Sequence, residues 1–109
     1  MQFDTNLKLA NEGDVDAMHQ VALHYINGDI VEQNANEGHK WLKEASELGH
    51  VQSMRDLGLS YYEGVGHHVD HRLALYWYEQ AAERGHASAM LNLANLYKYG
   101  EGTQVNYKK

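Results

Sequence analysis

The sequence predicts an all-α fold, an α-solenoid of antiparallel helix pairs, because it repeats with a period of 36 residues and each repeat has helical periodicity. The repeat needs no gaps. Positions that recur 36 residues apart include Met18, Met54 and Met90; Tyr25, Tyr61 and Tyr97; Gly28, Gly64 and Gly100; and Gly13, Gly49 and Gly85. Each repeat therefore represents one structural unit.

Two apolar stripes within each unit predict two helices, which we call A and B. In the second unit, helix A carries Met54, Leu57, Gly58 and Tyr61, and helix B carries Leu73, Ala74, Trp77 and Ala81. The spacings of three and four residues place each set on one helical face. The predicted helices are A at 15–27, B at 36–48, A at 51–63, B at 71–84 and A at 87–99.

Residues at the predicted helix ends agree with this interpretation. Asp70 is suited to cap the second B helix, while Gly49 and Gly85 supply the left-handed conformation that commonly ends a helix. We expect a single domain: a partial B helix or cap at 1–13, with the end of a B helix at 7–13, then repeats at 14–49 and 50–85 and a partial third repeat at 86–109. Residues 107–109 fall where a third B helix would begin.

Composition excludes several classes of function. Fifteen acidic and nine basic residues give a net charge of −6, and the cations are scattered, which argues against nucleic acid as a partner. The absence of cysteine excludes disulfides, thiolate metal sites and thiol nucleophiles. With no signal-peptide pattern and no long apolar run, we expect a cytoplasmic protein without membrane insertion; a periplasmic or secreted location stays open if an export signal has been removed.

Two sequence blocks carry a resemblance to a known family. The first is Ala17-(x3)-Val21-Ala22-(x2)-Tyr25-(x2)-Gly28, and the second is Ser53-(x3)-Leu57-Gly58-(x2)-Tyr61-(x2)-Gly64-Val65-Gly66. Each is followed by Trp-(x3)-Ala and a glycine. The chain resembles the Sel1-like repeat, a relative of the tetratricopeptide repeat. This resemblance implies a right-handed superhelix whose A helices line a concave face, and an adaptor or scaffold that binds other proteins.

The concave face can be assigned from the related tetratricopeptide architecture, in which the groove residues of helix A avoid the packing stripe. Transferred by position, they offer apolar and aromatic anchors together with polar and charged groups suited to a peptide. The alternative for Leu23, Leu59 and Leu91 is burial between helices. The expected partner-binding residues are Asp16, His19, Leu23, Ile26, Asn27, Gln52, Arg55, Leu59, Tyr62, Glu63, Ser88, Leu91, Asn95 and Lys98.

A cluster of imidazoles forms a second candidate site. His67, His68 and His71 lie with Asp70 within five residues, and these side chains are all ligands for zinc, nickel or copper. The segment spans a loop and a helix start, so the spacing does not guarantee a shared face. Helix capping by Asp70 is the competing interpretation, and we expect no resident metal or other cofactor.

Other histidines and aromatic residues have structural interpretations. His50 and His86 share one repeat position after a glycine, which favours a cap or turn, and the lone His19, His24 and His39 are expected on the surface or in the groove. Trp41 and Trp77 are repeat-equivalent, so packing of B against A explains them. Tyr76 and Tyr78 are about 200° apart on a helix, so at least one should reach the surface.

The sequence favours a binding module over an enzyme, because it contains neither a Ser-His-Asp pattern nor a phosphate-binding glycine loop. The leading hypothesis is recognition of a peptide or partner segment on the A-helix face. A second hypothesis is self-assembly through the helix at 87–99, whose residues Leu91, Leu93, Ala94, Leu96 and Tyr97 are too apolar to face water all round. Metal binding by the histidine cluster is the third.

Overall fold

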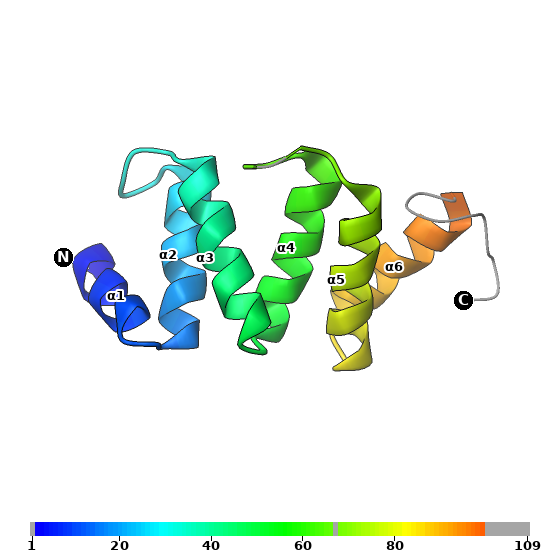
Figure 1. Cartoon of the computed structure of the whole chain (residues 1–109), viewed down its shortest axis with the longest axis horizontal. Helices are drawn as coiled ribbons and strands as arrows, with labels where there is room; N and C mark the ends of the chain where they lie inside the picture. Colours follow the sequence, from blue (N-terminus) through cyan, green and yellow to red (C-terminus); the bar gives the residue numbers. More distant parts are fainter. Residues whose placement is uncertain (1, 67, 100–109) are drawn as a thin grey trace.

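The computed structural model of the chain describes residues 2–66 and 68–99, with side chains described for residues 3–66 and 68–95 (Figure 1). All the secondary structure in this part of the chain is helical. The helices are α1 (Gln2–Asn11), α2 (Val15–Asn27), α3 (Ala35–Glu47), α4 (Val51–Glu63), α5 (His71–Glu83) and α6 (Ala87–Tyr99).

Helix ends follow the local sequence. The side chains of Asn34 and Asp70 accept backbone N–H groups of Glu37 and Leu73 and so cap α3 and α5. Gly28 and Gly64 end α2 and α4 in the left-handed conformation, with φ of 68° and 76°. Gly49 and Gly85, at φ of 96° and 87°, make the turns after α3 and α5. The predicted cap at Asp70 and the two predicted glycine turns are confirmed.

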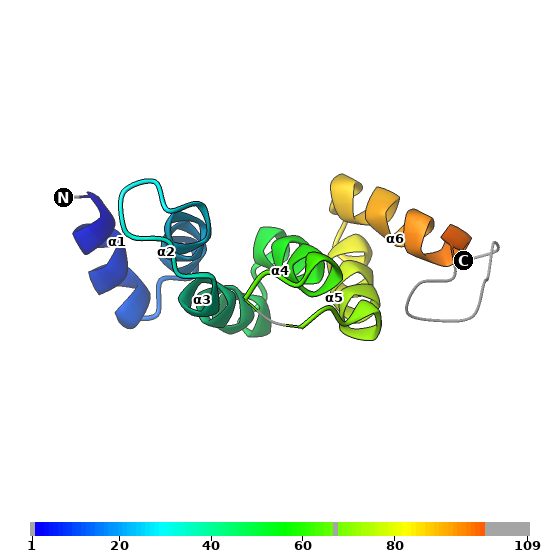
Figure 2. The same ribbon diagram turned by 90° about the horizontal axis from the view of Figure 1, so that it is seen from above.

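The helices form two layers, with α2, α4 and α6 on one side and α3 and α5 on the other (Figure 2). Each helix packs on its neighbours in the chain, most extensively α2 on α3 and α4 on α5. The described molecule is elongated, 47 by 25 by 17 Å. This arrangement places the A helices α2 and α4 side by side and leaves one face of each open.

The core between α4 and α5 depends on a small residue opposite a large one. Gly58 lies against the ring of Tyr78: a Cβ atom added to Gly58 would come within 2.8 Å of the ring carbon Cδ1. Tyr78 is 2% exposed, and its burial raises the pKa of the phenol to about 12. In the first repeat the same two positions hold Ala22 and Leu42, which are both completely buried. The two repeats therefore fill this space differently.

The predicted helix ranges agree closely with the structure. The two B helices α3 and α5 end one residue earlier than predicted, and α3 also begins one residue earlier, directly after its cap Asn34. The N-terminal helix α1 lies within the segment 1–13 and extends well before the helix end expected at 7–13, since it begins at Gln2 and packs Phe3 and Ala10 into the core with Ala17 and Met18 of α2. The periodicity of one short helix was too weak to reveal that extent.

The aromatic residues behave largely as predicted. Trp41 and Trp77 are half-buried and pack against the core that joins the two layers. Tyr78 is buried, whereas Tyr76 is 50% exposed, which confirms that one of these rings reaches the surface. His39 was predicted at the surface or in the groove, and this was wrong: it is buried edge-on against Tyr61, with 5.0 Å between ring centroids.

No helix within residues 2–66 and 68–99 combines the length and apolar character that crossing a membrane requires.

We predict that Gly58→Ala destabilises the fold by roughly 1 kcal/mol, because overpacking against the buried Tyr78 ring exceeds the gain in helix propensity. Tyr78→Leu alone should also destabilise, since it leaves a cavity. The double variant recreates the Ala22–Leu42 pair of the first repeat. Measured by urea unfolding, the double variant should be destabilised by at least about 1 kcal/mol less than the two single variants added together. Strict additivity would contradict this account.

Candidate functional site

A cleft of about 210 Å³ lies between the A helices α2 and α4, near the C-terminal ends of both. The cleft lies between helices because α2 and α4 belong to successive repeats and pack on the shared helix α3 and not mainly on each other. The residues that line it are Leu23, Ile26, Asn27, Leu42, Arg55, Asp56, Leu59, Ser60, Glu63 and Val65.

The cleft combines apolar walls with a polar edge. Leu23, Ile26 and Leu59 are half-buried, and Leu42 of α3 is completely buried. Asn27 and Glu63, which hold the same repeat position in α2 and α4, are exposed. Concave sites with apolar walls and a few polar groups are typical of places where proteins accept a side chain or small ligand.

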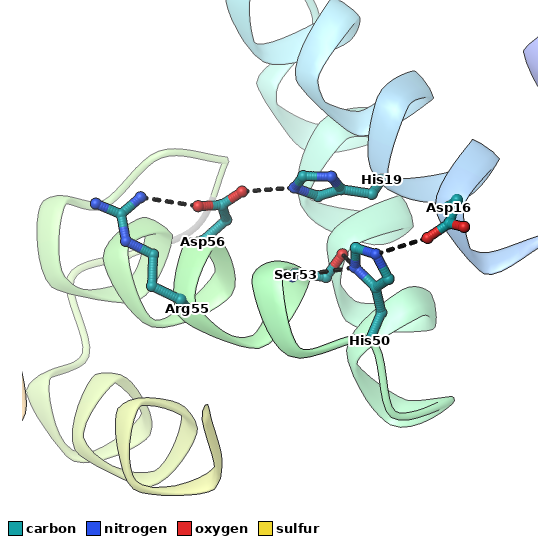
Figure 3. A network of polar contacts seen from close by, with 6 residues as sticks. All are labelled: Asp16, His19, His50, Ser53, Arg55 and Asp56. Carbon is teal, nitrogen blue, oxygen red and sulfur yellow. Dashed lines mark hydrogen bonds and ion pairs between the residues drawn. The ribbon is translucent and has the colours of Figure 1, made fainter. Parts of the chain in front are cut away.

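Arg55 and His19 converge on Asp56 beside this cleft (Figure 3). Arg55 Nη1 donates to Asp56 Oδ1 at 2.9 Å, and His19 Nε2 lies 2.7 Å from Asp56 Oδ2. The His19 side chain is only 8% exposed and that of Asp56 is 20% exposed. Because His19 belongs to α2 and the other two residues to α4, this network ties the two repeats together.

The electrostatics of Asp56 follow from these contacts. Burial is the largest single influence and raises the pKa of Asp56, but the hydrogen bonds from His19 and Arg55, together with their charges, lower this pKa below its ordinary value of 3.8. Asp56 is therefore a carboxylate at neutral pH. It holds the guanidinium of Arg55, whose side chain is 31% exposed, at the edge of the cleft.

A second pair of polar residues joins the same helices one turn away. His50 Nε2 lies 3.0 Å from Asp16 Oδ1, while His50 Nδ1 accepts the backbone N–H of Ser53 at 3.2 Å (Figure 3). The rings of His19 and His50 are 4.9 Å apart between centroids. The predicted capping role of His50 is confirmed. His86 also caps its helix, because its Nδ1 accepts the backbone N–H of Ala89 at 3.2 Å.

The structure brings together many of the predicted partner-binding residues. Six of them line the cleft: Leu23, Ile26, Asn27, Arg55, Leu59 and Glu63. The alternative interpretation of the leucines, burial between helices, holds only in part, because Leu23 and Leu59 are half-buried and Leu91 is 64% exposed.

The other predicted residues whose side chains are described lie outside the cleft. Tyr62 stacks on the ring of His71, with centroids 4.9 Å apart and an angle of 26° between the rings. Gln52, Ser88 and Asn95 are exposed. The side chain of Lys98 lies outside the described part of the chain, as do those of Leu96 and Tyr97.

One further histidine prediction needs correction, and a second histidine has a partner at the surface. His19 was expected to offer its ring at the surface or in the groove, but it is 6% exposed and bound to Asp56. His24 is half-buried, and its Nδ1 lies 2.8 Å from Asp29 Oδ1. The hydrogen bond to His24 is the largest influence on Asp29 and lowers the pKa of that carboxyl.

Sequence reasoning missed Asp56, which is central to the network. Its repeat-equivalent positions hold Gln20 and Asn92, so the repeat pattern gave no reason to select it. The one available signal was its place in helix A beside Arg55.

The structure describes only part of the predicted histidine cluster. His67 lies outside the described residues, and the ring of His71 stacks on Tyr62. Among residues 2–66 and 68–99, no three His, Cys, Asp or Glu side chains are grouped so that they could hold a metal ion. Asp70, the remaining candidate ligand, caps α5.

The fold and this cleft define a class of protein, a helical repeat domain with an open surface between successive repeats. Comparison with known families identifies the repeat. The family described as Sel1 repeat matches residues 15–50, 51–86 and 87–109. The chain therefore belongs to the Sel1 repeat family, whose members are generally protein–protein interaction modules and typically non-catalytic scaffolds.

Solved structures give the same result. A protective antigen of uropathogenic Escherichia coli with an SLR fold superposes with a TM-score of 0.94 at 30% identity, over 95% of this chain and 22% of that chain. A Sel1 repeat protein from Oxalobacter formigenes superposes with a TM-score of 0.90 at 30% identity, over 95% of this chain and 43% of that one. The chain thus spans less than half the length of either protein. No curated protein sequence matches it significantly.

We predict that Asp56→Asn lowers the free energy of unfolding by about 1–3 kcal/mol at neutral pH, because the buried His19 and the adjacent Arg55 lose a charged acceptor. The lowered pKa of Asp56 means that its stabilising contribution is present above pH 3.8 and is lost as pH falls below that value. The difference in the free energy of unfolding between wild type and variant should therefore shrink when urea unfolding is measured at about pH 3, below the ordinary pKa of an Asp carboxyl.

Asp4→Asn is a suitable control for this measurement, since Asp4 is exposed on α1, outside this network, and the change should cost less than about 1 kcal/mol. A stability loss in Asp56→Asn that does not change with pH would argue against an ionised Asp56 in this network.

Proposed function

We propose that this domain binds an extended or helical segment of another protein on its concave A-helix face, with the cleft between α2 and α4 as the anchor point. The observation that carries the proposal is the position of apolar walls, formed by Leu23, Ile26 and Leu59, directly beside the half-exposed Arg55. An apolar side chain of the partner enters the cleft, and Arg55 binds an acceptor on the same segment. Arginine next to an apolar pocket is a common composition of binding hot spots.

The hydrogen bonding of Arg55 supports this role. Its Nη1 is bound by Asp56, whereas its Nε is enclosed and has no hydrogen-bond partner among the described residues. An unpaired enclosed N–H group costs about 1–3 kcal/mol. The partner's carbonyl or carboxylate oxygen binds the N–H groups on the exposed part of this guanidinium, whose side chain is 31% exposed.

The polar network supports the proposal in a second way. Binding surfaces gain affinity when their anchor residues are already fixed before the partner arrives. Asp56 holds Arg55, and His19 holds Asp56 from the neighbouring repeat. The orientation of the guanidinium is thereby set by both repeats that form the cleft.

The proposal predicts that peptides selected for binding will depend on the cleft. Linear peptides selected from a phage-displayed random library against the whole chain should bind Leu59→Asp and Arg55→Ala at least about tenfold more weakly, the usual loss at a hot spot. Isothermal titration with the synthetic peptides measures the effect.

Two exposed residues of the B layer provide matched controls. Lys43→Ala and Tyr76→Ala remove side chains of α3 and α5 that lie outside the cleft, so both variants should bind as the wild type does. Selected peptides that tolerate both cleft substitutions but lose affinity with Tyr76→Ala would place recognition on the opposite layer and overturn the proposal.

We infer a second candidate function, self-assembly through α6, from the unequal burial of three repeat-equivalent methionines. Met18 and Met54 are each 3% exposed. Met18 belongs to the same core cluster as Ala45 of α3, and Met54 to the same cluster as Ala81 of α5. Met90 of α6 is 48% exposed and its neighbour Leu91 is 64% exposed. Adjacent exposed apolar side chains of this size favour contact with another molecule.

Self-assembly predicts that the wild-type chain forms dimers or longer oligomers in sedimentation-velocity experiments as its concentration rises. Met90→Glu combined with Leu91→Glu should shift it to monomer, because the like charges oppose contact between two copies of α6. Tyr76→Glu, which places the same charge on another helix, is the control. A wild-type chain that stays monomeric at the highest attainable concentration excludes this candidate.

A further inference from the structure

The three A helices begin at one repeat position, but their capping groups differ chemically. Asp14 Oδ1 accepts the backbone N–H of Ala17 at 3.0 Å at the start of α2. In α4 and α6 the acceptor is instead the imidazole Nδ1 of His50 or His86, each 3.2 Å from the backbone nitrogen that it caps. A carboxylate and an imidazole respond differently to acid.

Only the neutral imidazole can cap a helix through Nδ1. Protonation turns that acceptor into an N–H donor that faces the N–H group it previously bound. It also places a positive charge at the positive end of the helix dipole. Protonation of the ring therefore removes the hydrogen bond that caps the helix start. Carboxylates, by contrast, ordinarily remain acceptors throughout the range in which histidines titrate.

The surroundings of His50 compensate for its protonation. Asp16 Oδ1 lies 3.0 Å from His50 Nε2, Asp14 lines the same surface hollow, and the Ser53 hydroxyl lies 2.8 Å from Nδ1. When Nδ1 is protonated, the Ser53 hydroxyl oxygen can accept a hydrogen bond from it. The ring of His19 is the titratable neighbour from α2 and is bound to Asp56, whereas Glu47 at the end of α3 is exposed. A protonated His50 thus retains a carboxylate and a hydroxyl partner.

Among the residues that the structure describes, His86 lacks the same compensation. The residue equivalent to Asp16 in the next repeat is Gln52 on α4, and the residue equivalent to Ser53 is Ala89 on α6. Neither carries a charge or a hydroxyl. The first turn of α6 contains no acidic residue. The charged residues that precede the turn, Glu83 and Arg84, are exposed, and Arg84 donates to the carbonyl and side-chain oxygens of Gln80.

We propose that His86 is an acid-labile cap: protonation of its ring loosens the start of α6, while Asp16 and Ser53 protect the equivalent cap of α4. Helix α6 carries Ser88, Leu91 and Asn95 of the concave face. Mild acid therefore loosens the C-terminal part of that face and leaves the cleft between α2 and α4 intact. This property belongs to the free chain and does not depend on which partner it binds.

Amide hydrogen exchange read by mass spectrometry tests the proposal on the intact chain. Wild type and His86→Asp are compared at about pH 7.5 and about pH 5.5, either side of the ordinary histidine range. At the lower pH, α6 of the wild type should exchange about fivefold faster than α6 of the variant, the change expected for loss of one N-cap. At the higher pH the two proteins should differ little. Equal exchange of α6 in both proteins at the lower pH overturns the proposal.

Two further variants test the difference between the caps. Gln52→Asp places a carboxylate at the position that Asp16 holds beside His50, so it should reduce the acid-induced exchange of α6. Asp16→Asn should instead make the start of α4 acid-sensitive while α6 behaves as in the wild type. If Asp16→Asn leaves α4 as protected as before, Asp16 does not protect that cap and this half of the proposal is wrong.

Discussion

The structure depends on how closely each A helix approaches its B helix, and this distance is set by a small residue facing a large one. Gly58 faces Tyr78 in the second repeat, and in the first the same positions hold Ala22 and Leu42. Neither helix of a pair could bury its apolar stripe alone. The packing of A on B, followed by B on the next A, fixes the separation of α2 and α4 and so determines that a cleft forms between them.

Repetition supplies the scaffold, whereas the residues that differ between repeats give the surface its chemistry. His19 of the first repeat and Arg55 of the second occupy the same repeat position. Because the repeats lie side by side, both residues reach Asp56, which has no acidic counterpart in the other repeats. The cleft therefore combines an apolar wall with one fixed guanidinium, an arrangement that neither repeat could make by itself.

The sequence predicted the helices well because burial on one helical face imposes a period that can be read without the structure. It predicted the cap positions for the same reason, since Asp70, His50 and His86 each precede such a stripe. The network around Asp56 was not predictable, because it depends on the distance between two A helices and on rotamers, which periodicity does not encode. His19 and His39 were misplaced because a histidine is compatible with a surface or with a buried position that offers a partner.

The caps of the A helices share one repeat position, but this position does not reveal how each cap responds to acid. A side-chain acceptor at the helix start satisfies a backbone N–H group, and Asp14, His50 and His86 each supply one at the same repeat position. They differ only when a proton competes for the capping lone pair. Asp16 pairs with His50, whereas the equivalent position in the next repeat holds the uncharged Gln52. On this proposal, α4 and α6 carry the same type of cap but differ in their response to acid. The pH response of each repeat is thus determined by a neighbouring residue on the preceding A helix.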